Sequence, residues 1–238
     1  MVRIGKLLLG QEPVIALTVT DLDSPKFLQK TKHQGVKVLE IRIDRFKNLN
    51  ENHLLKKIHL FRKLGLPLIA TIRSRGEGGG RFLSDSKRAE LFKKILPWVQ
   101  AIDLELRSKE LQKSLIPLAR QQKKAVILSY HHFQATPRTS HLLKLIRQGK
   151  RKGADIVKLA VTPKTKNDLA RFLLLGHRSR NQNLIMIAMG PLGIPSRVLA
   201  PLFGSLLTYS FIGRSMAPGQ IPLPRLLRER QLFFKLKK

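Results

Sequence analysis

The chain alternates between short apolar runs and longer stretches in which apolar residues recur every three or four positions. Short apolar runs rich in branched residues are typical of buried strands, whereas the longer spacing is typical of amphipathic helices. The apolar runs predict strands at residues 14–20, 37–43, 67–72, 99–105, 124–130, 154–161, 183–188 and 206–211. The stretches between them predict helices at residues 24–34, 51–64, 84–96, 108–121, 138–151, 165–178, 196–204 and 222–231. Asn50, Ser84 and Thr165 are of the residue types preferred at helix N-caps, which supports three of the helix starts.

Strict alternation of strands and helices predicts a parallel sheet with helical crossovers. Units of roughly 30 residues use the whole length, which is close to the ~250 residues typical of a (β/α)₈ barrel. A doubly wound open sheet is the competing architecture, but no Gly-x-Gly-x-x-Gly follows the first predicted strand. We therefore predict an α/β fold, a single (β/α)₈ TIM-barrel domain over residues 1–238, with strands and motifs within about 14–225 and a basic C-terminal tail at 226–238.

The composition narrows the chemistry and the location. The chain has no cysteine, which excludes disulfides, thiolate metal sites and a cysteine nucleophile. This fits a reducing compartment, and we expect a cytoplasmic protein. The most apolar region, residues 184–213, is interrupted by three prolines and by Arg197, so we expect no membrane span.

The formal net charge of +31 is extreme. Such a chain binds nucleic acids and anionic surfaces non-specifically at low salt. The charge is spread along the whole chain, without a basic arm, zinc-finger spacing or an aromatic-rich RNA-binding motif. We therefore expect a generally basic surface with non-specific nucleic-acid binding rather than dedicated recognition.

Lys158 stands in the apolar run 153–161 with apolar neighbours on both sides. A charged amine in such a strand is costly unless it is paired or loses its proton. One interpretation is a lysine at a strand end that extends to water. The other is a desolvated, partly neutral amine that attacks a carbonyl group to form an imine.

Other polar residues gather at the ends of the predicted strands, where the active sites of TIM barrels lie. Glu40, Arg42 and Asp44 alternate along one face of a strand, which predicts either an internal ion-pair network or a ligand site. Arg73 ends the next strand, and Glu77 follows in a glycine-rich loop that lacks the Gly-Lys-Ser/Thr ending of a phosphate-binding loop.

His131 and His132 follow the fifth predicted strand. A histidine at a strand end is a candidate general acid/base because its ordinary pKa is near neutrality. The doublet also suggests a metal, but no third ligand has convincing spacing, and we predict no metal site.

Six segments along the chain together match a known family: Glu-Ile-Arg-Ile-Asp (40–44), Thr-Ile-Arg-Ser-Arg-Gly-Glu-Gly-Gly (71–79), Ser-Tyr-His-His-Phe (129–133), Gly-Ala-Asp-Ile-Val-Lys (153–158), residues 189–197 and Ala-Pro-Gly-Gln (217–220). The chain resembles the type I 3-dehydroquinate dehydratases, the Schiff-base enzymes of the shikimate pathway. The resemblance implies a lyase that eliminates water from 3-dehydroquinate to give 3-dehydroshikimate, without a cofactor, and suggests a homodimer.

The resemblance also implies roles for individual residues. Lys158 would form the imine with the substrate ketone, His131 would be the general acid/base, and Glu77 would orient it. Substrate-binding roles fall to Glu40, Arg42 and Arg73 at the ring hydroxyls, Met189 as an apolar contact, Arg197 at the carboxylate, and Ser215 and Gln220 in the closing loop.

Two positions depart from the family pattern. His132 stands where an acidic or amide residue usually follows the catalytic histidine, and a charged His132 would disfavour charge on His131. Met216 stands where the family has serine, and Ser215 comes one place earlier.

Two other functions stay open from the sequence. One is a class I aldolase-like barrel with the same lysine, although Arg197 and the Glu-x-Arg-x-Asp strand favour the dehydratase. The other is a catalytically inactive basic barrel that binds nucleic acid.

Overall fold

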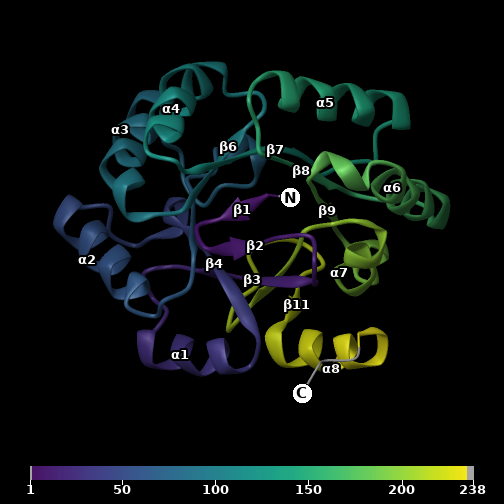
Figure 1. Cartoon of the computed structure of the whole chain (residues 1–238), viewed down its shortest axis with the longest axis horizontal. Coiled ribbons are helices and arrows are strands. Elements are labelled where there is room, and N and C mark those ends of the chain that lie inside the picture. Colours follow the sequence, from purple (N-terminus) through teal and green to yellow (C-terminus); the bar gives the residue numbers. More distant parts are fainter. Residues whose placement is uncertain (1, 235–238) are drawn as a thin grey trace.

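The computed structural model describes residues 2–234, and in this part eight parallel strands curl around a central axis inside a ring of helices (Figure 1). The barrel strands are β3 (Val14–Val19), β4 (Val36–Arg42), β5 (Leu68–Thr71), β6 (Ala101–Glu105), β7 (Ala125–His132), β8 (Ile156–Val161), β9 (Leu184–Ala188) and β10 (Leu207–Phe211). The helices between and after them are α1 (Pro25–His33), α2 (Glu51–Arg62), α3 (Asp85–Ile95), α4 (Lys109–Gln121), α5 (Thr139–Arg151), α6 (Lys166–Arg178), α7 (Ser196–Leu199) and α8 (Leu223–Phe233).

Each strand from β3 to β8 pairs in parallel with the next one, and β10 pairs in parallel with β3. Between β9 and β10 the ladder is reduced to a bridge between Leu184 and Ser205, next to which Leu206 N donates to Leu184 O at 2.8 Å. The barrel therefore closes at this point by a short contact. The predicted (β/α)₈ barrel is confirmed.

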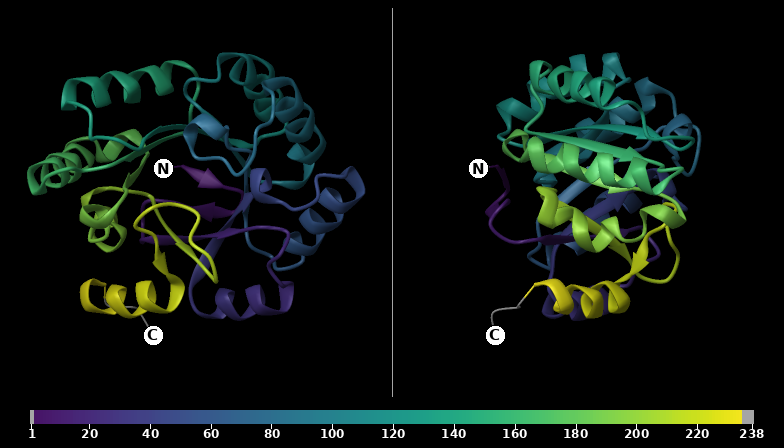
Figure 2. Two further views of the ribbon diagram at one scale, coloured as in Figure 1. Left: turned by 180° about the vertical axis from the view of Figure 1, so that it is seen from behind. Right: turned by 90° about the vertical axis from the view of Figure 1, so that its right-hand side faces the viewer.

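The helix starts follow the predicted capping chemistry. The side chains of Asn50, Ser84 and Thr165 accept backbone hydrogen bonds at the starts of α2, α3 and α6. Thr165 and Asp168 together form a capping box, which satisfies two backbone donors at once. Helix α8 packs beside α1 at the closure of the ring (Figure 2).

Three features differ from the sequence prediction. A hairpin of β1 (Arg3–Ile4) and β2 (Leu7–Leu8) precedes the barrel, and β11 (Ile221–Pro222) pairs with the end of β10. The predicted helix at 196–204 is one turn of α7 followed by a 3₁₀ helix at Ala200–Phe203, because Pro201 cannot donate a backbone hydrogen bond there.

The predicted basic tail at 226–238 is helical as far as Phe233, because it continues α8. Arg230 of this helix is buried and donates to Pro13 O at 3.0 Å, which fixes the helix against the start of β3. Residues 235–238 lie outside the described residues.

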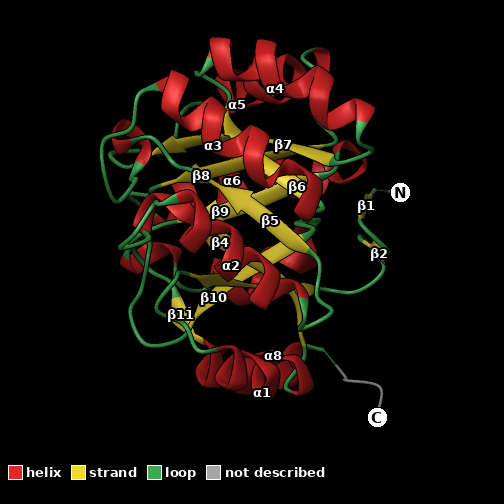
Figure 3. Cartoon of the chain, turned by 90° about the vertical axis from the view of Figure 1, so that its left-hand side faces the viewer, coloured by secondary structure: helices red, strands yellow, loops and turns green. Residues whose placement is uncertain are grey.

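The core has two layers. One packs the helices against the outside of the strands, and the other fills the barrel interior. Val2, Ile4 and Leu9 of the hairpin segment belong to the interior layer, so the hairpin closes the N-terminal end of the barrel. Figure 3 places this hairpin on the side away from β11, which leaves the C-terminal end for the site. No helix within residues 2–234 is long and apolar enough to cross a membrane.

Candidate active site

A ring of four side chains from alternate strands surrounds the centre of the barrel. Glu40 comes from β4, Asp103 from β6, Lys158 from β8 and Tyr209 from β10. Alternate strands of such a barrel contribute side chains at one height, which is why residues so distant in sequence meet. Two positions earlier on the same four strands, the interior residues are apolar: Val38, Ala101, Ile156 and Leu207. The polar ring therefore rests on an apolar floor.

Lys158 contacts the other three members of this ring. Its Nζ lies 2.9 Å from Asp103 Oδ2 and 3.3 Å from Glu40 Oε1. It also lies 4.3 Å from the centroid of the Tyr209 ring. The residue is only 4% exposed, so the interpretation as a strand-end lysine that extends to water is wrong. Its neighbours in sequence are apolar, but its neighbours in space are two carboxylates and an aromatic face.

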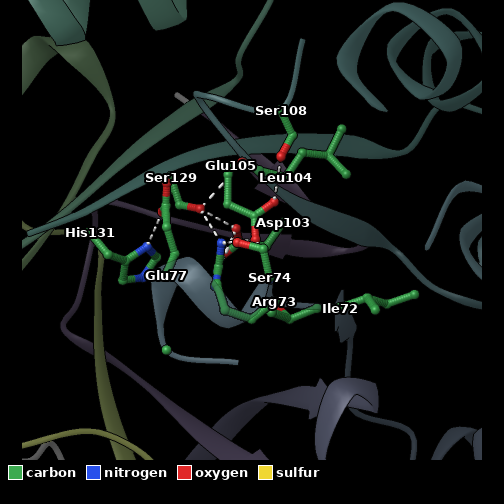
Figure 4. A network of polar contacts seen from close by, with 12 residues as sticks. Ile72, Arg73, Ser74, Glu77, Asp103, Leu104, Glu105, Ser108, Ser129 and His131 are labelled. Atoms are coloured by element: carbon green, nitrogen blue, oxygen red, sulfur yellow. Dashed lines mark hydrogen bonds and ion pairs between the residues drawn. The ribbon is translucent and has the colours of Figure 1, made fainter. Parts of the chain in front are cut away.

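Asp103 is held as a carboxylate by its surroundings (Figure 4). Its Oδ1 accepts a hydrogen bond from Ser129 Oγ at 2.6 Å and pairs with Arg73 Nη2 at 2.8 Å. Burial alone would raise the pKa of Asp103, but Arg73 and Lys158 outweigh it and hold this pKa below its usual range. A permanent negative charge therefore stands beside Lys158.

Arg73 extends the network away from the lysine. It donates to Ser129 Oγ at 2.7 Å and lies 3.4 Å from Glu105 Oε1, and Glu105 in turn pairs with the buried Arg88. The sequence prediction missed Asp103, Glu105 and Arg88. A signal existed, because the charges in Ala-Ile-Asp-Leu-Glu (101–105) alternate along one face of a predicted strand, as they do in residues 40–44.

Of the three charges predicted to share one strand face, Glu40 has its own partners, whereas Arg42 at the end of β4 pairs with Asp44 in the following 3₁₀ turn Ile43–Arg45. Glu40 Oε1 accepts from Thr71 Oγ1 at 2.6 Å and faces Lys158. Arg42 forms a two-pronged pair with Asp44, with Nε–Oδ1 at 3.0 Å and Nη2–Oδ2 at 2.8 Å. Asp44 Oδ2 also accepts from Gly80 N at 2.9 Å. The glycine-rich loop is thus anchored by a carboxylate.

His131 and Glu77 form a hydrogen-bonded pair at the rim of the ring. His131 Nδ1 lies 2.8 Å from Glu77 Oε2 (Figure 4). Burial lowers the pKa of His131 well below its ordinary value, and the positive charges of Arg73 and Lys158 lower it further. Burial raises the pKa of Glu77 to about 7. Near neutral pH, Glu77 is therefore the member of the pair that gains or loses a proton, and His131 stays neutral.

The backbone beside Glu77 depends on glycine. The 3₁₀ turn Arg75–Glu77 ends at Gly78 with φ of 85°, a conformation that favours glycine. At Gly79 a Cβ atom would lie 2.1 Å from Arg73 O, so only glycine lets the loop approach the strand end this closely. These turns bring Glu77 back over the barrel to reach His131.

His132 has a structural contact instead. Its Nδ1 accepts a hydrogen bond from Ala135 N at 3.0 Å, which is incompatible with a proton on that nitrogen. The expected effect of a charged His132 on His131 is therefore not supported. The lowered pKa of His131 comes from burial, Arg73 and Lys158.

Arg197 is the only arginine of the site without a carboxylate partner among the described residues. It is 2% exposed and donates to Pro218 O at 3.0 Å, while its buried Nε has no partner in this part of the chain. Burial lowers the pKa of Arg197 to about 10. At neutral pH it is a buried cation that a ligand anion could neutralise.

The loop after β10 is ordered by Gln220. Its side-chain oxygen accepts from Met216 N at 2.8 Å and from Ala217 N at 3.2 Å. Met216 lines the cavity, whereas Ser215 is exposed and donates to Ala217 O at 2.8 Å. Ser215 does not itself line the cavity, although its hydroxyl group also lies 3.3 Å from Gln220 Oε1, so its binding role stays a prediction.

One cavity joins the remaining predicted residues at the C-terminal end of the barrel. Its empty volume is about 530 Å³, with the open solvent at its mouth included. The other nine predicted site residues line it: Glu40, Arg42, Arg73, Glu77, His131, Lys158, Met189, Arg197 and Gln220. Tyr209 and Phe133 line it as well and were not predicted. Among residues 2–234, no group of three or more His, Cys, Asp or Glu side chains is placed to hold a metal ion.

Comparison with known proteins identifies the family. A family model described as "Type I 3-dehydroquinase" matches residues 14–236. The chain belongs to the type I 3-dehydroquinase family. The resemblance inferred from the motifs is thereby confirmed over almost the whole chain, and the aldolase-like alternative is wrong.

Individual members of the 3-dehydroquinase family align over nearly their full length. The 3-dehydroquinate dehydratase of Methanocella arvoryzae is 38% identical over 215 residues, which cover 90% of this chain and 94% of the relative. That of Aquifex aeolicus is 34% identical and is covered completely, with 94% of this chain matched. The crystal structure of the enzyme from Geobacillus kaustophilus superposes with a TM-score of 0.88 at 29% identity, covering 98% of this chain and 96% of that one.

Proposed function

We propose that the chain is a 3-dehydroquinate dehydratase that eliminates water from 3-dehydroquinate through an imine on Lys158, with His131 as the general acid/base. One observation carries the proposal. A buried lysine amine, a histidine and an arginine that has no carboxylate partner within residues 2–234 line the same cavity. These groups match a substrate that has a ketone, an acidic neighbouring C–H bond and a carboxylate.

Lys158 converts the substrate ketone into a protonated imine, which is the better electron sink. A neutral Lys158 amine attacks the ketone carbon, the C–N bond forms, and the ketone oxygen leaves as water after protonation. The protonated imine withdraws electrons better than the ketone does, so the adjacent C–H bond loses its proton more readily. The resulting enamine expels the β-hydroxyl group as water, and a further water molecule releases the product from the lysine. Asp103 and Glu40 hold the nitrogen in place by their contacts at 2.9 Å and 3.3 Å.

The histidine moves the protons. With Glu77 ionised, His131 Nδ1–H donates to the carboxylate, and Nε2 keeps a free lone pair that can remove the proton beside the imine. The protonated ring can then donate to the departing hydroxyl group. With Glu77 protonated, the carboxylic acid donates to Nδ1 instead, which leaves the hydrogen on Nε2 and removes the base.

The arginines and neighbouring side chains position the substrate. Arg197 supplies a guanidinium for the substrate carboxylate, since its Nε has no partner in the described part of the chain. Arg42, Arg73 and Glu40 present polar atoms to ring hydroxyl groups from the opposite wall of the cavity. Met189 contributes an apolar contact, and Gln220 organises the loop that covers the site.

A direct assay tests the proposed reaction. The purified chain is mixed with 3-dehydroquinate, and formation of the conjugated product 3-dehydroshikimate is followed by its ultraviolet absorption and by mass spectrometry. The proposal requires substrate loss and product gain in equal amounts. A chain that binds the substrate without forming product would instead support an inactive barrel.

Arg197→Ala is expected to weaken substrate handling mainly through KM, because the carboxylate is held equally in the ground state and the transition state. Loss of the contact should cost about 2–5 kcal/mol, by analogy with buried charge pairs at interfaces. Arg197→Lys should also be impaired, since lysine keeps the charge but loses the fork geometry.

The control for Arg197 is a substrate analogue without the carboxylate. Wild type and Arg197→Ala should handle this analogue equally badly. If the analogue still distinguishes the two proteins by about tenfold or more in kcat/KM, Arg197 acts on another group.

The pH dependence should follow Glu77. Its pKa of about 7 means that it carries a proton below that pH, and the free lone pair on His131 Nε2 appears as the pH rises. We expect kcat/KM to increase as the pH is raised through about 7. Because the pKa of His131 is well below its ordinary value, His131 itself does not produce this limb. Glu77→Gln should lower activity and abolish the limb; a Gln variant that keeps it would assign the titration to another group.

Three further properties belong to this proposal. The family resemblance supports a homodimer, which sedimentation equilibrium can measure. The net charge of +31 supports non-specific nucleic-acid binding that weakens as salt is added. The absence of cysteine and the proposed metabolic reaction support a cytoplasmic location.

A further inference from the structure

The aromatic ring of Tyr209 covers one side of the reactive amine. Lys158 Nζ lies 4.3 Å from the ring centroid, over its face. Tyr209 is 2% exposed and comes from β10, so it is the fourth member of the ring that contains Glu40 and Asp103. Unlike those two residues, it presents no charge and cannot take a proton from the amine through its ring.

The hydroxyl group of Tyr209 does not account for its position. The oxygen is buried and has no hydrogen-bond partner among residues 2–234. Burial raises the pKa of Tyr209 well above its ordinary value, and Glu40 and Asp103 raise it further, so the phenol stays neutral. An unpartnered buried hydroxyl group destabilises a fold. The feature that contacts the lysine is the ring face.

We propose that Tyr209 is a further catalytic residue, whose ring face stabilises the positive charge on the Lys158 nitrogen when that nitrogen becomes part of the protonated imine. The inference rests on the proposed function, because it requires the imine. The faces of aromatic rings carry partial negative charge and attract cations, most strongly where water is excluded.

The ring differs in effect from the carboxylates at the same site. When the amine attacks the ketone, a C–N bond forms, and the ketone oxygen takes one proton from the nitrogen and one from the general acid His131. The C–O bond then breaks as water leaves, so a cationic C=N bond replaces the neutral amine and ketone. The carboxylates beside this nitrogen also serve other partners, Arg73 for Asp103 and Thr71 for Glu40. The ring face stabilises the cation without accepting a proton. This stabilisation lasts as long as the nitrogen is charged, and it ends when removal of the neighbouring proton gives the neutral enamine.

Two substitutions separate the ring from the hydroxyl group. Tyr209→Phe keeps the ring, and its kcat should stay within about twofold of wild type with no loss of thermal stability. Tyr209→Leu removes the ring but keeps an apolar side chain, and its kcat should fall about tenfold with little change in KM. Borohydride trapping with substrate should then yield less adduct on Lys158 in the Leu variant than in the Phe variant.

Ile187→Ala is the matched control, because Ile187 lines the same cavity and is largely buried but carries no aromatic ring. Equal losses of adduct in Ile187→Ala and Tyr209→Leu would assign the effect to water entry and overturn the proposal. A Phe variant as impaired as the Leu variant would overturn it too, because the hydroxyl group would then be responsible.

A fluorinated series keeps the test decisive if the Leu variant does not fold. Phenylalanine with increasing numbers of ring fluorines at position 209 weakens the negative potential of the face with little change in shape. The proposal requires kcat to fall stepwise along the series, and an unchanged kcat overturns it. Failure of the proposed function is recognised separately, since wild type would then form neither 3-dehydroshikimate nor an adduct on Lys158.

Discussion

Lys158→Ala is expected to have no measurable turnover of 3-dehydroquinate, because among residues 2–234 no other lysine lines the cavity to form the imine. Borohydride reduction in the presence of substrate should add a reduced adduct to the wild-type peptide that carries Lys158. Labelling of a different lysine, or of none, would contradict the assignment.

The same substitution should also destabilise the barrel. From the sequence alone, removal of Lys158 need not destabilise the fold, because its sequence neighbours are apolar, but the structure pairs it with Asp103 and Glu40. Asp103 keeps Arg73 as a partner, so among the described residues Glu40 is the carboxylate left without a cation. Breaking a buried pair from one side typically costs about 3–5 kcal/mol, and we expect a loss in the free energy of unfolding of up to that size.

A double variant separates the two roles of Lys158. Lys158→Met combined with Glu40→Gln removes both the amine and the unpaired charge, so stability should recover toward wild type in a chemical denaturation experiment. Turnover should stay absent. Recovery of turnover together with stability would mean that Lys158 serves the fold and not the chemistry.

His131→Ala is expected to reduce kcat by roughly 10²–10⁴-fold, the range for loss of a general acid/base. The proton beside the imine would then have to leave to water or to a group not aligned with it. Steady-state kinetics at several pH values measure the effect. The loss should appear in kcat rather than KM, because His131 acts on protons that move only in the transition state.

His132→Ala is the matched control, since it removes a neighbouring imidazole that bonds to Ala135 N outside the cavity. We expect a small change in activity and an unchanged pH profile, because burial, Arg73 and Lys158 lower the pKa of His131. If His132→Ala proved the more damaging of the two substitutions, the assignment of the acid/base would be reversed.

The sequence by itself determined the order of strands and helices, because each element carries its own periodicity and its own caps. The strand at residues 154–161 is apolar over most of its length, and Thr165 begins the next helix with a capping box. Once the barrel is inferred, residues at strand ends such as Arg73 and His131 must meet at one end of it. These conclusions need only local chemistry and one topological rule.

The sequence prediction missed short elements whose local signals are weak. The strands β1, β2 and β11 have two residues each, which is too short for a period to be recognised. The position of Ser215 was also missed, because the course of a loop depends on its tertiary contacts. Here Gln220 binds the backbone of Met216 and Ala217, and Ser215 turns to the outside.

Only the tertiary structure decided which charges meet. The partners of Lys158 lie 118 and 55 residues away, and neither distance has a signature in the sequence. Which side chains share a height depends on how far neighbouring strands are shifted along each other when the sheet closes, and that shift is a property of the whole barrel. The same closure placed the Tyr209 ring over the amine and left Arg197 without a carboxylate in the described chain. Local chemistry thus determines the elements, and only the closed barrel brings their charges together.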